Sequence, residues 1–251
     1  MAIRSNIGKL VPLREKLKTT IKLLSGKYFE PTLFADGALT VYPWDSSVDE
    51  WVIERAKKGN TKSIPFELLT RLCDLKGVDY RKFPYGEVDT VLFVARALNH
   101  ASKLKFTAVC PACEHKWVEE VVVPDNLEKI GEKGPDYLGY DDVTLAESTD
   151  VVRIRPLLVG DVHNITTRTN KSIPESTAML ISTIVSINGT TPDSPEECHA
   201  YLLAITVADR KALEAAVEAT TPHLSKTLRI ECPECGHEFS HQLRIDEDFF
   251  R

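Results

Sequence analysis

Two short stretches of the chain carry the same arrangement of residues that could bind a metal. The first reads CPACEHKW over residues 110–117, and the second reads CPECGHEF over residues 232–239. Each has two cysteines with a proline between them, then a histidine, then an aromatic residue. Thiolates and imidazoles are the usual ligands of Zn²⁺, and a structural zinc site takes four of them in a tetrahedron. The two stretches are therefore either two sites or two halves of one.

The segments on either side of each cysteine pair are typical of β-strands. Residues 103–109 (KLKFTAV) and 117–123 (WVEEVVV) flank the first pair, and residues 224–231 and 238–245 flank the second. Apolar and polar residues alternate in these segments, and two such strands around a cysteine pair predict a hairpin with the cysteines at its tip. Two such tips supply a tetrahedral site. We predict a split zinc ribbon that binds one structural Zn²⁺ per chain through Cys110, Cys113, Cys232 and Cys235.

Other chemistry at these cysteines is less favoured. Two separate sites would each need further ligands, and His115 or His237 lies too close to the second cysteine of its pair for ideal geometry at one metal. His241 is a further candidate, but its strand position is typical of a surface residue. A redox dithiol would need a strand-to-helix context of the thioredoxin kind. A catalytic zinc keeps an open position, which four thiolates do not leave. Because the deaminase signature and the common hydrolase and nucleotide motifs are absent too, we predict no catalytic residues and no enzyme.

The charge of the chain is unevenly distributed. Residues 1–28 carry seven Lys and Arg against one Glu, a net +6, so the remaining residues sum to −12 of the total −6. Glutamates also surround both cysteine pairs. A nucleic-acid binder is usually basic as a whole domain. We therefore predict protein–protein contacts, with nucleic acid unlikely as a partner, and keep a zinc-ribbon transcription or processing factor as the alternative.

The bulk composition favours a reduced, cytoplasmic environment. No apolar run approaches the length of a membrane helix, and the first residues lack the pattern of a signal peptide. Cysteines in that setting are read as metal ligands or core residues. Cys73 and Cys198 lie on apolar helical faces, so we predict that they are core residues.

Helices and strands can be placed around these motifs. Leucines and isoleucines recur from Leu13 to Leu24, which predicts a basic amphipathic helix. This helix packs on its own body or docks on another subunit; a membrane-surface helix is least favoured, because the apolar face lacks an aromatic anchor. Ser47 and Glu50 form a capping box that predicts a helix start, and Ser194 predicts another. Further helices are predicted over residues 63–77, 87–100, 160–169, 174–187 and 208–220, with strands at 38–44 and 151–156.

The sequence predicts an α+β fold, with a mostly helical body and two zinc-knuckle hairpins. The expected divisions are a basic arm or helix (1–30), a strand plus helices (31–102), the split zinc ribbon (103–123 and 224–245), an acidic linker (124–150), an inserted helical region (151–222) and a C-terminal tail (246–251).

This order of elements, with the paired CPAC and CPEC knuckles and the ending DEDFFR at residues 246–251, resembles the baseplate hub and tail-assembly proteins of contractile-tailed, T-even-like bacteriophages. The resemblance implies a structural or assembly component of the tail baseplate. Its partners would be other baseplate and tail proteins or further copies of itself. Its location would be the virion, the cytoplasm of the bacterial host, or both.

Two segments are predicted to meet those partners. The basic arm offers Arg14, Lys18 and Lys22, and the tail offers Phe249 and Phe250. A pair of phenylalanines at such a place either folds back onto the body or is buried in a partner.

Overall fold

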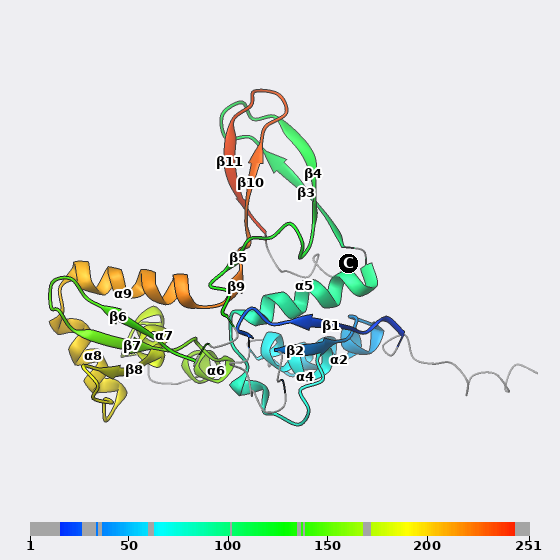
Figure 1. Cartoon of the computed structure of the whole chain (residues 1–251). Coiled ribbons are helices and arrows are strands. Elements are labelled where there is room, and N and C mark those ends of the chain that lie inside the picture. Colours follow the sequence, from blue (N-terminus) through cyan, green and yellow to red (C-terminus); the bar gives the residue numbers. More distant parts are fainter. Residues whose placement is uncertain are drawn as a thin grey trace, which may run out of the picture.

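The chain folds into three parts, which are visible in a computed structural model (Figure 1). The structure describes residues 16–26, 34, 37–59, 63–100, 102–134, 137, 139–167 and 172–243, and of residues 99 and 100 it describes the backbone alone. A pair of hairpins rises from a central body, and a wing of one small sheet and three helices extends from the side of that body. This mixture of helices with small antiparallel sheets confirms the predicted α+β class.

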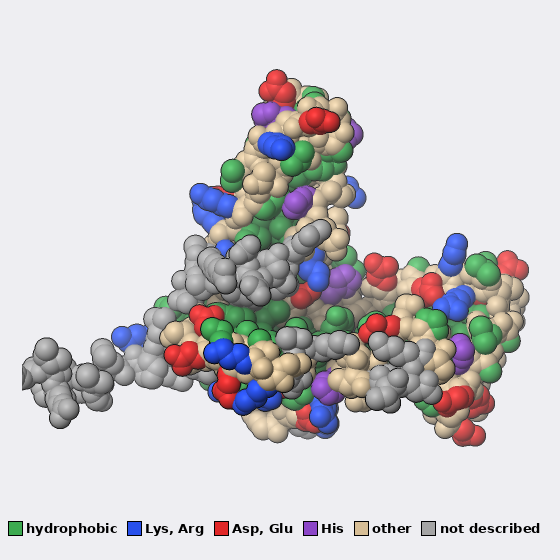
Figure 2. All heavy atoms as spheres, turned by 180° about the vertical axis from the view of Figure 1, so that it is seen from behind, with side chains coloured by type: hydrophobic (Ala, Val, Ile, Leu, Met, Phe, Trp, Pro, Cys, Tyr) green, Lys and Arg blue, Asp and Glu red, His purple; other side chains and the backbone are tan. Residues whose placement is uncertain are grey.

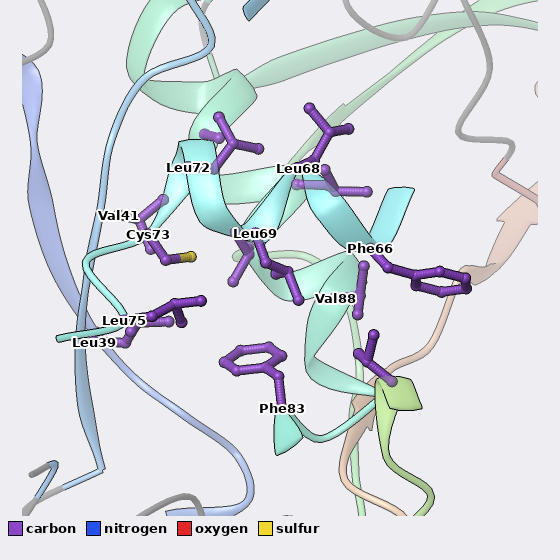
Figure 3. Close-up of a cluster of buried hydrophobic side chains, with 14 of the residues drawn as sticks. Leu39, Val41, Phe66, Leu68, Leu69, Leu72, Cys73, Leu75, Phe83 and Val88 are labelled. Atoms are coloured by element: carbon purple, nitrogen blue, oxygen red, sulfur yellow. The ribbon is translucent and has the colours of Figure 1, made fainter. Parts of the chain in front are cut away.

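The central body is built from the first part of the chain and one later helix. Its elements are β1 (Thr19–Lys22), β2 (Ala38–Val41), α2 (Ser46–Lys57), α3 (Ile64–Glu67), α4 (Leu69–Leu72), the 3-10 helix Tyr80–Lys82, α5 (Glu87–His100) and α6 (Val159–Thr167). Apolar side chains from β2, α4 and α5 face one another in its core, and Leu39, Leu69 and Phe83 are fully buried there (Figure 3). Cys73 is also buried in this core, as predicted.

The wing follows the middle of the chain. Its sheet has the order β6 (Asp141–Thr144), β7 (Val151–Ile154), β8 (Ile184–Ile187), and its helices are α7 (Glu175–Thr183), α8 (Pro195–Ala204) and α9 (Val207–Thr220). Leu145, Ile154, Leu202 and Leu213 form its buried centre. Cys198 lies in the same cluster, which confirms its predicted place in the core.

The hairpin pair stands on a third apolar cluster. One hairpin joins β3 (Lys103–Val109) to β4 (Lys116–Val122), and the other joins β10 (Thr227–Glu231) to β11 (Glu238–Gln242). At their base, β5 (Lys129–Ile130) pairs with β9 (His223–Leu224). Phe93 of α5 is fully buried against Val123 and Leu224 beneath the hairpins. The body therefore fixes where both hairpins begin.

The helix expected from Leu13 to Leu24 is wrong over residues 19–22. This segment is strand β1, which pairs antiparallel with β2 from Thr19 opposite Val41 to Lys22 opposite Ala38. The β-branched residues in TTIK favour a strand, and pairing with β2 satisfies its backbone. Leu13 itself lies outside the described residues.

The region between the two hairpins contains more sheet than expected. The acidic linker predicted over residues 124–150 includes β5 and β6, which pair with strands later in the chain. The helix predicted to continue past Thr183 ends there, and Ile184–Ile187 forms β8. Leu145 and Ile154 become buried only because these strands meet. Long-range pairing of this kind overrides local propensity.

Two helix boundaries also differ from expectation. The N-cap of α2 is Asp45, whose carboxylate accepts hydrogen bonds from the backbone N–H groups of Ser47 (3.0 Å) and Val48 (3.2 Å). Ser47 is therefore inside the helix. The helix predicted to reach residue 77 ends at Leu72, because Cys73 bridges to Val41 at the edge of β2.

Candidate metal centre

The two hairpin tips have equivalent backbone geometry. The N–H of Cys110 donates to the carbonyl of His115 at 3.0 Å, and the N–H of Cys232 donates to the carbonyl of His237 at 3.0 Å. Each tip then turns through a left-handed residue, Glu114 with φ +60° in the first and Gly236 with φ +70° in the second. This repeated turn directs both cysteines of a pair to the same side.

The tips meet, and the four sulfurs form one cluster. The Sγ atoms of Cys110 and Cys235 are 3.7 Å apart, those of Cys113 and Cys232 are 3.6 Å apart, and all four lie within 4.8 Å of one another. A tetrahedron of thiolates around zinc at about 2.3 Å places sulfurs about 3.8 Å from each other. The donor set and its spacing therefore fit a Cys₄ zinc site.

The cluster is half enclosed. Cys110 and Cys232 are each 1% exposed, whereas Cys113 and Cys235 face solvent. The backbone N–H of Ala112 donates to the sulfur of Cys110 at 3.4 Å. The first cysteine of each pair therefore lies buried between the two hairpins, and the second cysteine of each pair lies on the solvent side of the cluster.

The thiols do not ionise alike. Burial alone would raise the pKa of Cys110, but hydrogen bonds from the N–H groups of Cys113 and Ala112 outweigh it and lower this pKa to about 7. For Cys113, a backbone hydrogen bond from His115 favours the thiolate, yet the neighbouring sulfurs raise the pKa to about 12. Four negative charges at this spacing repel one another, so full ionisation of the cluster requires a cation among them.

The histidines of the motifs make contacts of another kind. The ring of His115 stacks on Trp117, that of His237 stacks on Phe239, and that of His241 stacks on Phe106 with centroids 4.3 Å apart. Trp117 and Phe239 then meet edge to face between the hairpins. Over the described part of the chain, the grouping able to hold a metal consists of the four cysteines. This geometry favours one shared site over two sites completed by histidines.

Chemically, the arrangement suits a clamp. Four thiolates complete a tetrahedral shell and leave no position for a reacting water. The centre would instead join two hairpins whose sequences are separated by the whole wing. Together, the fold and site define an α+β protein with four cysteines from two hairpins clustered where they could hold one metal ion.

A comparison with protein families narrows this class. The family model described as T4 bacteriophage base plate protein matches residues 51–251, and the chain belongs to this family. The family name places the chain with baseplate proteins of a phage tail, as the resemblance implied. Neither the curated proteins nor the solved structures contain a match.

The predicted partner-binding residues are only partly placed. Lys18, just before β1, and Lys22, at the end of β1, are both exposed. Arg14, Phe249 and Phe250 lie outside the described residues. Among the helices that are described, none combines the length and apolarity needed to cross a membrane.

Sequence reasoning missed two features of the body. One is a groove beside the base of the hairpin pair, to which α2, α5 and the end of α9 contribute. The other is Glu87, a fully buried carboxyl at the start of α5. The groove has no local signal, because its residues come from distant segments. Glu87 resembles any acidic residue in the first turn of a helix.

Proposed function

We propose that this protein is a structural or assembly component of a phage tail baseplate that acts through protein–protein contacts and is stabilised by one Zn²⁺. The family match carries the baseplate assignment. The convergence of Cys110, Cys113, Cys232 and Cys235 supports the metal. A baseplate is an assembly of proteins, so surfaces and rigidity are the properties that such a component needs.

The metal would stabilise the contact between the two hairpins. Zinc binding contributes on the order of 10 kcal/mol or more in small metal-folded peptides. Here it would hold β3 and β4 against β10 and β11, and so fix the wing between two anchored ends. The hairpin pair would then be rigid before assembly, and a rigid surface loses less entropy when a partner binds it.

Metal analysis of the purified full-length chain tests this proposal. We expect one zinc per chain, and loss of that zinc in Cys113→Ser and in Cys235→Ser alike. Cys198→Ala is the matched control, because Cys198 is buried in the wing, away from the cluster. Two zincs per chain, with each mutant losing one, would contradict the shared site; a metal-free wild type would contradict the zinc.

An infection experiment tests the baseplate role. The proposed location is the virion baseplate, the cytoplasm of the host during assembly, or both. Phage that carry Cys113→Ser in this chain should accumulate incomplete tails, and phage with Cys198→Ala should not. Electron microscopy of the lysates distinguishes the two results, and normal tails in both cases would refute a need for the metal centre in assembly.

Protein contacts would involve the basic arm with Arg14, Lys18 and Lys22, and the tail with Phe249 and Phe250. Nucleic acid is the less favoured partner, because exposed glutamates surround the metal centre. Those at the tips are Glu114, Glu231, Glu234 and Glu238. Binding to DNA or RNA that weakens steeply with added salt would favour the alternative of a nucleic-acid-binding factor.

A further inference from the structure

A groove lies where the hairpin pair meets the central body. Its volume is about 1390 Å³, and its lining combines Trp44, Val52 and Leu92 of the body with residues of α9 and of the hairpin base. Apolar side chains gather at this junction (Figure 2). Pockets for small ligands are usually about 300–1,000 Å³. The size of the groove suits a segment of polypeptide better than a small molecule.

Two large side chains in the groove are unusually open to solvent. Ile53 is 53% exposed and Tyr85 is 38% exposed, and both line the groove. Contiguous apolar surface of this kind commonly marks a place where another segment binds. The occupant should therefore offer apolar side chains.

The charges along the groove indicate a basic occupant. Asp49, Asp89 and Glu218 contribute −3 and Lys226 contributes +1, which leaves −2 with His223 neutral. Lys226 already pairs with Asp89 at 2.8 Å. Glu218 and Asp49 are exposed, and Asp49 also accepts a hydrogen bond from the indole of Trp44. The carboxylates of Asp49 and Glu218 can therefore still attract a basic segment.

The N-terminal sequence has the matching chemistry. Residues 1–15 contain three Lys and Arg and one Glu, a net +2. Ile3, Ile7 and Leu10 follow the i, i+4, i+7 spacing of a segment that docks in an apolar groove.

The start of β1 brings this segment to the groove. Since Thr19 pairs with Val41, the residues before β1 leave the sheet at the end where β2 continues to Trp44, which lines the groove. Fifteen residues span up to about 50 Å when extended. The segment can therefore lie along the groove from its own attachment point.

We propose that residues 1–15 dock in the groove of their own chain before the protein is assembled. Ile3, Ile7 and Leu10 cover Ile53 and Tyr85, while the Lys and Arg residues face the carboxylates. Covalent attachment gives the arm a high effective concentration at the groove. This goes beyond the proposed function: a neighbouring subunit that takes up the arm also uncovers the groove, so the two contacts exclude each other.

Photo-crosslinking in the full-length chain tests the contact. A benzoylphenylalanine placed at position 53 should crosslink to residues 1–15 within one chain, which mass spectrometry detects at the mass of the monomer. The same probe at position 203 is the control, because Leu203 is 68% exposed but does not line the groove. It should give no crosslink to the arm.

Charge reversal in the arm tests whether electrostatic attraction to the groove contributes to docking. Arg4→Glu, Lys9→Glu and Arg14→Glu together should lower the crosslink yield about tenfold, because the arm would then be repelled by the exposed carboxylates of Asp49 and Glu218 instead of attracted to them. Reversal of Lys116, Lys129 and Lys211, exposed lysines outside the groove, should leave it unchanged.

Two results would overturn the proposal. Crosslinked dimers that contain the arm of one chain and the groove of another would assign the groove to a second copy. Crosslinks that avoid residues 1–15 would exclude the arm altogether. Neither result bears on the zinc content, so the proposed baseplate role is tested separately.

Discussion

Single residues at the hairpin tips show how one turn is built from two different amino acids. Glu114 and Gly236 occupy equivalent left-handed positions, directly after the second cysteine of each pair. Glycine adopts this conformation freely, whereas a residue with a Cβ pays about 1–2 kcal/mol. The first tip therefore carries backbone strain that the second tip lacks.

Glu114→Gly should raise the free energy of unfolding by about 0.5 kcal/mol, since relief of strain outweighs the extra freedom of glycine in the unfolded chain. Gly236→Ala should lower it by about 1 kcal/mol through strain, because a Cβ there meets only Glu231 Oε1 at 3.6 Å, an ordinary contact. Denaturant titration of the zinc-loaded protein measures both.

The control for this pair is Gly134→Ala. Gly134 has neither a left-handed φ nor any atom within 4 Å of an added Cβ. If Gly236→Ala proved as harmless as this control, strain at the tip would not be the reason for the glycine.

Glu87 is the residue whose environment most strongly changes its ionisation. It is fully buried, the N–H of Ser25 donates to its Oε1 at 2.6 Å, and its Oε2 has no hydrogen-bond partner among the described residues. Burial raises its pKa from 4.5 to about 7, against the opposing effect of the Ser25 hydrogen bond. The folded protein therefore binds this proton more tightly than the unfolded chain does.

The stability from this protonation is present below pH 4.5 and is lost as the pH rises to about 7. Glu87→Gln has no charge to bury. We therefore expect it to raise the free energy of unfolding by about 3 kcal/mol at pH 8 and to change it little at pH 4.5. Urea titrations at the two pH values measure the difference, with the exposed Glu50→Gln as control. An equal effect of Glu87→Gln at both pH values would contradict this ionisation.

At the scale of elements, several helix and strand boundaries differ from those that the sequence predicts. Asp45 rather than Ser47 caps α2, and strand pairing replaces helix in β1 and β8. In contrast, Ser194 caps α8 as its sequence predicts, accepting a hydrogen bond from the N–H of Glu197 at 3.2 Å. Strand pairing therefore overrides the helical signal in β1 and β8, whereas the cap signal of α8 meets no such competition.

Substitution of Asp45 and of Ser47 tests which residue caps α2. Asp45→Ala should destabilise the protein by about 1 kcal/mol, because two N–H groups at the start of the helix lose their acceptor. Ser47→Ala should have an effect within about 0.5 kcal/mol. Thermal or urea unfolding compares the two variants, and a larger loss in Ser47→Ala would return the cap to the position expected from the sequence.

At the scale of the whole molecule, the buried apolar side chains fall into three clusters, one in the body, one at the hairpin base and one in the wing. The cluster of four cysteines lies at the far tip of the hairpin pair, away from the cores of the body and the wing (Figure 1). Removal of a bound zinc should therefore affect the hairpin pair alone. It should loosen the two hairpins from each other without unfolding the rest.

Hydrogen–deuterium exchange before and after zinc chelation tests this independence. Amides in β3, β4, β10 and β11 should lose protection, because the hairpins would open more often without their clamp. Amides in β6 to β8 of the wing serve as the internal control and should keep theirs. Loss of protection in the wing as well would mean that the metal stabilises the whole fold cooperatively.

The sequence alone determined the parts whose signals are local. Two C-P-x-C motifs between alternating strands define both hairpins and their four cysteines, since thiolate chemistry and period-2 patterning need no knowledge of distant residues. The α5 helix and the buried position of Cys198 follow from helical periodicity in the same way, whereas Cys73 is buried as expected but in an extended bridge to Val41 just after α4.

Only the tertiary structure decided the features that depend on distant partners. It showed that the two tips meet with sulfurs 3.6–3.7 Å apart, a spacing that the sequence allowed but did not require. It also turned the segments of β1, β6 and β8 into sheet, buried Glu87, and assembled the groove. Each of these results from contacts between residues far apart in the chain, where the energy of pairing and burial exceeds local propensity.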